Sequence, residues 1–375
     1  MTAGGSCGCA ASGPGVGVGN RGLPRLRRAV WLRAAMQRLF PYALAGLAWL
    51  LGGCGRQTPA AEQGATPPVE LTRVRFQLDG DPQIEAGGYF LAQARGFYRA
   101  GGLEVEIISG GPGGDAKEQV AAGSAELGAT DGNCVIAAVS RGRPLVIVGA
   151  EMQRSPLGLM FHHTRPLRSF RDLDGRTLIA NTSMVWVDFL QRSQRVRFDR
   201  MPYTADLTGF IADESLVRQC FVTQEPFVTE QRGAKVGFLL VADSGFDPYR
   251  VIYANRAFAA RHPEAIRRFL AATVAGYNEL IEGDPTPAFA AIAAANPAMA
   301  REVMEHGLAM MRELRLVQGR REDHERTGRI VADRIAGQIE QLRQFNQLAR
   351  PVAVDEVARF DLVPVEDSRP TERIP

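Results

Sequence analysis

The sequence predicts an α/β protein built of two lobes, and two observations lead to this prediction. Between Val74 and Asn255, short apolar strands alternate with helices, which is the rhythm of an α/β fold with a largely parallel sheet. From His262 to Leu348 the pattern changes, and we expect the chain to be helical throughout. The simplest architecture is two lobes with a cleft between them and the C-terminal helices packed on the first lobe. We expect the chain to cross at Gly158–His162 and to return at Tyr249–Tyr253.

Each expected element follows from its own pattern. Strands are recognised by alternating or continuous apolar residues, and helices by an apolar face followed by a glycine stop. The last group of helices begins with a long apolar stripe in residues 263–283. In order, we expect a strand at 74–80, a helix at 89–102, a strand at 103–110, helices at 116–128 and 134–142, strands at 144–152 and 155–163, a helical turn at 169–175, a strand at 176–181, a helix at 182–193, a strand, helix and strand within 219–240, and a strand at 251–255.

Composition is that of an ordinary folded protein. Of the 375 residues, 45% are hydrophobic and 23% charged, and the net charge of +3 is too small to indicate nucleic-acid binding.

The N-terminal region has the features of an export signal. Arg38 is followed by an apolar run, Leu39–Leu51, which is too short to span a bilayer at ~20 residues. The run ends in Leu-Gly-Gly-Cys, which resembles the bacterial lipobox and makes Cys54 the expected lipidation site. An uncleaved anchor helix is the alternative. Residues 57–71 have the composition of a flexible tether, and Met36 is a well-placed alternative start.

The cysteines leave few options for disulfides. Cys7 and Cys9 precede the signal and Cys54 is the expected lipid site, so only Cys134 and Cys220 remain. An exported protein could pair these two, but we expect them in different lobes, where a bridge would lock the molecule. We therefore expect two buried free thiols.

Several segments together resemble periplasmic solute-binding proteins of ABC importers. The similarity is greatest to the thiamine-pyrimidine synthase-like branch, which includes formylaminopyrimidine-binding and riboflavin-binding lipoproteins, with aliphatic sulfonate-binding proteins as more distant relatives. It covers about residues 74–360 and implies a type II periplasmic-binding-protein fold. In order, the segments are YFLAQARGFYRAGGLEVEIISGG, EQVAAGSAELG, SFRDLDGRTLIA, QCFVTQEPFVTEQRGAKV and VIYANRAFAARHPEAIRRFLAATVAGYNELI.

The resemblance implies binding rather than catalysis. The related fungal synthase carries a cysteine-rich motif and a reactive histidine just after the first strand. Here the corresponding position is Ala86, and there is no cysteine-rich motif. The export signal points the same way, because a cytosolic biosynthetic enzyme has no use for one. A pyrimidine-synthesis enzyme is the alternative from another class.

Three polar residues of the first lobe are candidate ligand contacts. In the pyrimidine binders the first strand ends in a motif whose tryptophan covers the ring. Here that position is Gly80, which leaves room for a bulkier ring. The resemblance places Asp79 and Gln83 at the cleft, although Asp-Gly-Asp-Pro is also a turn signal. Asn133 begins a helix that borders the cleft in this family, and it is either a ligand contact or an N-cap. The glycine-rich stretch 109–115 is either a phosphate cradle or an ordinary loop.

Four residues of the second lobe are further candidates. Ser183 precedes a helix that it can cap, and related sulfonate binders hold an anion at such a helix start. Trp186 either stacks on an aromatic ligand or packs in the core. The Y-x-T-x-E-P motif of the pyrimidine binders begins here at Phe221. It implies that Phe221 packs on the ring and that Glu225 accepts from its exocyclic amine. Glu225 also precedes a proline at a helix start, where the helix N-terminus stabilises a carboxylate.

No catalytic or metal site is predicted. The usual hydrolase, zinc-protease and dinucleotide motifs are absent in context. The adjacent His162 and His163 point to opposite sides of a strand, so they are not simple ligands of one ion. We expect no cofactor.

The sequence therefore predicts a lipid-anchored solute-binding component of an ABC importer, on the periplasmic face of a bacterial membrane. The leading ligand is a small heterocycle such as a thiamine pyrimidine precursor, and the alternatives are riboflavin or an aromatic or aliphatic sulfonate. The expected partners are permease and ATPase subunits and, through the lipid, the membrane. We expect a monomer without nucleic-acid binding. The expected division is 1–53 leader and signal, 54–72 lipidated cysteine and tether, 73–158 first lobe, 159–248 second lobe, 249–362 helical return to the first lobe, and 363–375 tail.

Overall fold

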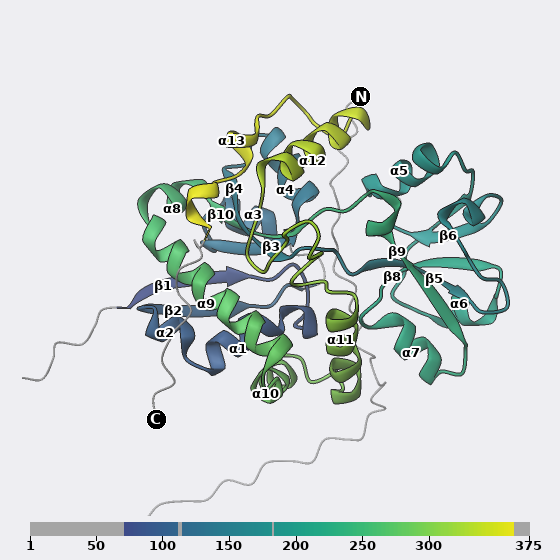
Figure 1. The fold of residues 1–375 in the computed structure, drawn as a ribbon, viewed down its shortest axis with the longest axis horizontal. Helices are drawn as coiled ribbons and strands as arrows, with labels where there is room; N and C mark the ends of the chain where they lie inside the picture. Colours follow the sequence, from purple (N-terminus) through teal and green to yellow (C-terminus); the bar gives the residue numbers. More distant parts are fainter. Residues whose placement is uncertain (1–70, 112–114, 182–183, 364–375) are drawn as a thin grey trace, which may run out of the picture. The chain divides into compact units, whose positions relative to one another are not determined.

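A computed structural model describes residues 71–111, 115–181 and 184–363, which contain two five-stranded sheets (Figure 1). The predicted signal segment, Cys54 and the tether lie outside the described residues. We call the described parts of 71–152 and 250–363 the first lobe, and those of 157–240 the second lobe.

The first lobe is built on a sheet with the strand order β2-β1-β3-β10-β4. All its strands run in one direction except β10, which is antiparallel to both of its neighbours. One face packs against α1, α2 and α9, and the other against α3, α4 and α12 (Figure 1). The strands are β1 Thr72–Gln77, β2 Leu103–Ile108, β3 Leu127–Asp131, β4 Leu145–Met152 and β10 Arg250–Asn255.

The second lobe repeats this plan with the order β7-β6-β8-β5-β9. Here β5 is the reversed strand, antiparallel to β8 and β9. Figure 1 shows α5 on one face of this sheet, and α6 and α7 on the other. The strands are β5 Leu157–His162, β6 Thr177–Ala180, β7 Asp199–Pro202, β8 Leu216–Phe221 and β9 Val236–Leu240.

Each reversed strand is the first strand that the chain forms after crossing between the lobes. After a crossing, the chain enters the sheet at the edge where the parallel strands end, whereas a helix-to-strand connection enters at the edge where they begin. The strand that follows a crossing therefore runs antiparallel to its neighbours. The prediction of a largely parallel sheet is thus confirmed, with β5 and β10 as the one antiparallel strand of each sheet. The crossings lie at 153–156 and 241–249. The predicted positions fall too far along the chain, because those residues form most of β5 and β10 themselves.

The helices follow most of the predicted pattern, with several corrections. The helix expected at 116–128 ends at Ala121, and the last two residues of that range begin the unpredicted strand β3. The short helix α6 was not predicted. The single helix expected at 89–102 is two helices, because Gly96 adopts a left-handed conformation with φ 74°. The chain is not helical throughout from His262, because residues 314–331 form turns in which two glycines and two other residues have positive φ. The helices are α1 Gly87–Ala94, α2 Phe97–Ala100, α3 Ala116–Ala121, α4 Gly132–Ser140, α5 Val185–Gln194, α6 Thr208–Ala212, α7 Glu225–Gln231, α8 Arg256–Arg261, α9 Pro263–Glu282, α10 Thr286–Ala295, α11 Arg301–Glu313, α12 Ala332–Gln344 and α13 Val354–Val357.

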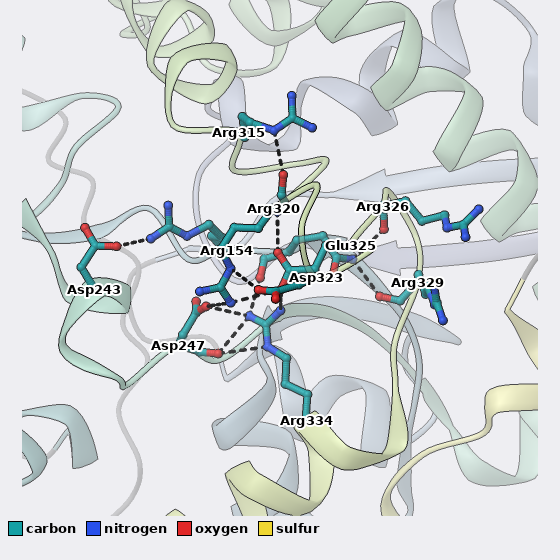
Figure 2. A network of polar contacts seen from close by, with 12 residues as sticks. Arg154, Asp243, Asp247, Arg315, Arg320, Asp323, Glu325, Arg326, Arg329 and Arg334 are labelled. Carbon is teal, nitrogen blue, oxygen red and sulfur yellow. Dashed lines mark hydrogen bonds and ion pairs between the residues drawn. The ribbon is translucent and has the colours of Figure 1, made fainter.

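Both crossings are held by one polar network at the start of α12, drawn in Figure 2. The Arg334 guanidinium donates to the Asp247 carbonyl at 3.0 Å and to the Gln153 carbonyl, so one side chain contacts both crossings. The same group pairs with Glu325 at 2.7 Å and lies over the Tyr249 ring, 3.8 Å from its centre. The turn segment 314–331 is therefore tied to the two connections about which the lobes would move.

The first lobe depends on close contact between α1 and α9. A Cβ built on Gly276 would lie 2.2 Å from the carbonyl oxygen of Gly88 and 2.8 Å from the Ala92 Cβ. The absence of a side chain at Gly276 therefore lets the two helices approach, and it brings Tyr277 into the buried aromatic cluster with Tyr89.

We expect Gly276→Ala to lower the free energy of unfolding by about 1–3 kcal/mol, because the new methyl group must push the α1 backbone away. Urea unfolding monitored by circular dichroism measures this loss. The control is Gly337→Ala on exposed α12, where a Cβ meets nothing within 4 Å. It should raise stability by roughly 0.4–1 kcal/mol. Equal effects of the two substitutions would contradict the packing argument.

Candidate functional site

A pocket opens where β1 ends and the two lobes face each other. Parallel strands place their carboxyl ends at one edge of the sheet, and ligands of α/β proteins bind at such edges. The second lobe contributes Phe221, from the end of β8. The polar lining all comes from the first lobe and consists of Asp79, Asp81, Gln83, Glu85, Glu151 and Arg250.

Arg250 is the centre of this pocket. It is the first residue of β10, and the strand register places it opposite Asp131 of β3 and Met152 of β4. Its guanidinium makes two hydrogen bonds to Asp79, at 3.1 and 3.2 Å, and one to Glu151 at 3.3 Å. A third carboxylate, Asp131, lies 3.8 Å away. Arg250 therefore ties the return crossing to the ends of three other strands.

The carboxylates around Arg250 outnumber its single charge. Burial raises the pKa of Glu151 to about 7 and that of Asp131 to about 6, while Arg250 opposes both shifts. Glu151 also accepts a hydrogen bond from the Tyr89 hydroxyl at 3.1 Å. One guanidinium cannot neutralise three carboxylates, of which Asp131 and Glu151 are buried, so this part of the pocket favours positive charge or hydrogen-bond donors.

Glu85 is a second buried acid in the same lining. It lies on a short 3₁₀ turn, Ile84–Ala86, whose position is held by a hydrogen bond from the Tyr277 hydroxyl to the Glu85 carbonyl at 2.8 Å. One carboxylate oxygen accepts from the Thr223 hydroxyl of the second lobe. The other, Oε2, is buried and has no hydrogen-bond partner among the described residues. Burial raises the pKa of this carboxyl group.

Glu225 holds the backbone of one pocket residue in place. It is buried at the start of α7, where its carboxylate accepts from the Phe221 backbone N–H at 2.7 Å and from the Tyr203 hydroxyl at 3.1 Å. Burial raises its pKa to about 7. Glu225 is not among the residues that line the pocket. In this conformation it fixes the backbone of Phe221, which does line the pocket.

The predicted contacts are therefore brought together only in part. Asp79, Gln83 and Phe221 line one pocket. Asn133 is buried at the start of α4, and its Oδ1 finds no partner within the described part of the chain. Trp186 is fully buried in the core around α5, which is the packing role weighed for it above. Ser183 lies outside the described residues. Ligand contact by these residues stays a prediction.

Four polar pocket residues were not predicted from the sequence: Asp81, Glu85, Glu151 and Arg250. A signal was present for two of them, because Glu151 is the next-to-last residue of the apolar strand β4 and Arg250 begins the apolar strand β10. A charged residue in a buried strand is costly unless it is paired. Each of these two charged residues therefore implied an oppositely charged partner, although the sequence of its own strand does not identify that partner.

The histidines and cysteines form no metal site in the described part of the chain. His162 is buried, stacks on Phe210 and shares a hydrogen bond of 2.9 Å with the Phe210 carbonyl, whereas His163 is exposed. Cys220 is a buried free thiol, as expected. The expectation is wrong for Cys134, which is disulfide-bonded at the packed start of α4.

We expect Glu225→Gln to lower the free energy of unfolding of the empty protein by about 1–3 kcal/mol, because an amide NH₂ would face one of two N–H or O–H donors. Chemical unfolding measures the change, with exposed Glu230→Gln on the same helix as the control. Unchanged stability together with lost ligand binding would instead make Glu225 a direct ligand contact.

Glu151 should make stability depend on pH. The folded protein holds the Glu151 proton up to about pH 7, whereas the ordinary pKa of a glutamate is 4.5. Raising the pH through this interval therefore costs folding free energy. We expect this cost to reach up to about 3 kcal/mol, at ~1.4 kcal/mol per pKa unit. The difference in unfolding free energy between wild type and Glu151→Gln, measured at pH 5 and pH 8, isolates it. Parallel pH curves would contradict the assignment.

A family model places the chain among known proteins. The model described as NMT1/THI5 like matches residues 83–288, which is more than half of the chain. Within the described residues, no helix has both the length and the apolar character needed to cross a membrane.

Similar proteins and structures agree with this match. The riboflavin-binding protein RibY of Chloroflexus aurantiacus is 25% identical over 249 residues, which cover 62% of this chain and 70% of RibY. The aliphatic sulphonate-binding protein SsuA of Escherichia coli has the same fold, with 17% identity, a TM-score of 0.60 and coverage of 81% and 96% of the two chains. The alkanesulfonate-binding SsuA of Xanthomonas axonopodis pv. citri has 14% identity, a TM-score of 0.56 and coverage of 77% and 99%. The expected type II periplasmic-binding-protein fold is thereby confirmed, and the chain belongs to the NMT1/THI5-like family.

Proposed function

We propose that this protein is the solute-binding component of an ABC importer and closes on a small heterocycle that carries amino groups, such as a thiamine pyrimidine precursor. The observation that carries the proposal is the acid-rich lining of the pocket. The lining contains four acids, Asp79, Asp81, Glu85 and Glu151, and one guanidinium, and Phe221 offers an aromatic face. A flat ring with N–H donors fits both features.

The same lining disfavours an anionic ligand. Binding an anion there would place it among carboxylates, and the one cation, Arg250, already pairs with Asp79 and Glu151. The sulfonate-binding proteins share the fold, but at identities of 14–17% this likeness shows the fold alone. The charge of the pocket therefore separates the proposed ligand from a sulfonate.

Riboflavin is the second candidate. The observation that favours it is the 25% identity to a riboflavin-binding protein over 70% of that protein's length. Gly80 also lines the pocket at the position where the pyrimidine binders have a tryptophan, which leaves room for a larger ring system.

Binding without catalysis is supported by the position of Ala86. This residue lines the pocket at the place that corresponds to the reactive histidine of the related synthase. Nearby pocket side chains are acids, an arginine and a phenylalanine, which can hold a ligand by charge and stacking. Closure of the lobes would then be driven by contacts that the ligand makes with both of them.

Export and lipid anchoring complete the proposal. The lipobox-like ending at Cys54 would anchor the protein on the periplasmic face of a membrane, and the tether at 57–71 would let it reach its permease. Permease and ATPase subunits are the partners that this role requires, with the binding protein itself acting as a monomer.

A thermal-shift series with purified protein tests the ligand class. We expect 4-amino-2-methylpyrimidine to raise the Tm in proportion to the logarithm of its concentration over Kd, by an amount that corresponds to ~2.7 kcal/mol at 100 times Kd. Taurine and an aromatic sulfonate should have no effect. A response to riboflavin alone would select the second candidate. A response to a sulfonate alone would reject the proposal.

A further inference from the structure

Beside the pocket, the two lobes are in contact through residues 222–224, which connect β8 to α7. The Thr223 hydroxyl donates to Glu85 across the gap, and the Thr223 carbonyl is so near Gly307 of α11 that a Cβ there would lie 2.8 Å from it. Beside this contact, Phe227 of α7 stacks on His306 of α11 with ring centres 4.5 Å apart. The Thr223 side chain is completely buried, so the contact belongs to a closed arrangement of the lobes.

Glu85 stands at the junction of this contact and the pocket. Its side chain is 6% exposed, and its backbone is held from below by Tyr277 of α9. Carboxylate oxygen Oε1 is used by Thr223, whereas Oε2 is buried without a partner among the described residues. Because Glu85 also lines the pocket, this oxygen is an acceptor at the place where a ligand would lie.

Asp79 and Glu151 do not offer the same buried acceptor, and the carboxylate of Asp81 belongs to a residue that is only half-buried. Both oxygens of Asp79 accept from Arg250, and the two oxygens of Glu151 accept from Arg250 and Tyr89. Among the described side chains that line the pocket, Glu85 alone has a buried oxygen for which no hydrogen bond is found. A buried carboxylate oxygen without a hydrogen bond destabilises the conformation that contains it.

We propose that Glu85 accepts a hydrogen bond from an N–H group of the ligand. Through the hydrogen bond that it also accepts from Thr223, it couples this contact to closure of the lobes. The proposal rests on the proposed function and names the group that carries its specificity. The carboxylate then has two donors, one from the ligand and one from the second lobe. A ligand without an N–H donor leaves Oε2 unsatisfied and stabilises the closed form less. A ligand shifts a conformational equilibrium only by the difference between its affinities for the two conformations. The hydrogen bond to Glu85 contributes directly to that difference between the open and closed forms.

The test measures binding of 4-amino-2-methylpyrimidine by isothermal titration calorimetry and by stopped-flow fluorescence. We expect Glu85→Gln to weaken binding at least tenfold, because the amide replaces one of two acceptors by a donor. Thr223→Val should raise the dissociation rate several-fold, whereas Thr223→Ser, which keeps the hydroxyl, should behave like wild type. Exposed Glu322→Gln is the matched control for removal of one negative charge. Circular dichroism shows whether each variant is folded, and Glu85→Asp replaces Glu85→Gln if the latter is not.

Failure of this proposal is distinguishable from failure of the proposed ligand class. If the wild type binds riboflavin and not the aminopyrimidine, the ligand class is wrong, and the same variants are measured with riboflavin. If Glu85→Gln binds the ligand that the wild type accepts with the affinity of the wild type, the proposed role of Glu85 is wrong. A readout without ligand completes the test, because the Tm losses of Glu85→Gln and Thr223→Val should be non-additive in the empty protein. Additive losses would show that the two side chains do not act together.

Discussion

The ion pairs of Arg250 are the interaction on which the rest of the structure depends. This one guanidinium lies where the chain returns from the second lobe, and it contacts acids that follow or end β1, β3 and β4. A buried charge of this kind is stable only if its partners stay in place, since removing one partner leaves an uncompensated charge. The same pairs that hold the strand ends together therefore also determine the electrostatic character of the pocket.

The surplus of carboxylates explains how a binding site can be selective before any ligand arrives. Asp131 and Glu151 have raised pKa values because burial disfavours their charged forms more than Arg250 stabilises them. The pocket is thus prepared for a group that donates hydrogen bonds or carries positive charge. The family and its structural neighbours share a scaffold, so the ligand has to be argued from the side chains of the pocket and not from the fold.

The contact between the lobes and the brace on the two crossings use different residues. The hinge is braced by Arg334 and the turn segment 314–331, which hold both crossings (Figure 2). The contact in front of the pocket uses Glu85, Thr223 and α11. Because the C-terminal segment supplies both α11 and the brace, its packing on the first lobe is needed for either to form. The helical prediction for this segment missed the turns, although Gly319 and Gly328, which have positive φ, are glycines of the kind that ends a helix.

The sequence by itself determined the fold class, most of the elements in their order and three of the pocket residues, but it missed β3, β7 and α6. Strand and helix periodicity is local, because it lies in neighbouring residues, whereas Asp79, Gln83 and Phe221 were recognised through the resemblance to the motifs of the family. Only the tertiary structure decided which charges meet. Asp79, Asp131, Glu151 and Arg250 are far apart in the chain, and they come together because β10 runs antiparallel between β3 and β4 in one particular register. The direction of Glu225 was decided in the same way. Its carboxylate is used by Phe221 and Tyr203, because a buried carboxylate takes the donors that the fold places beside it.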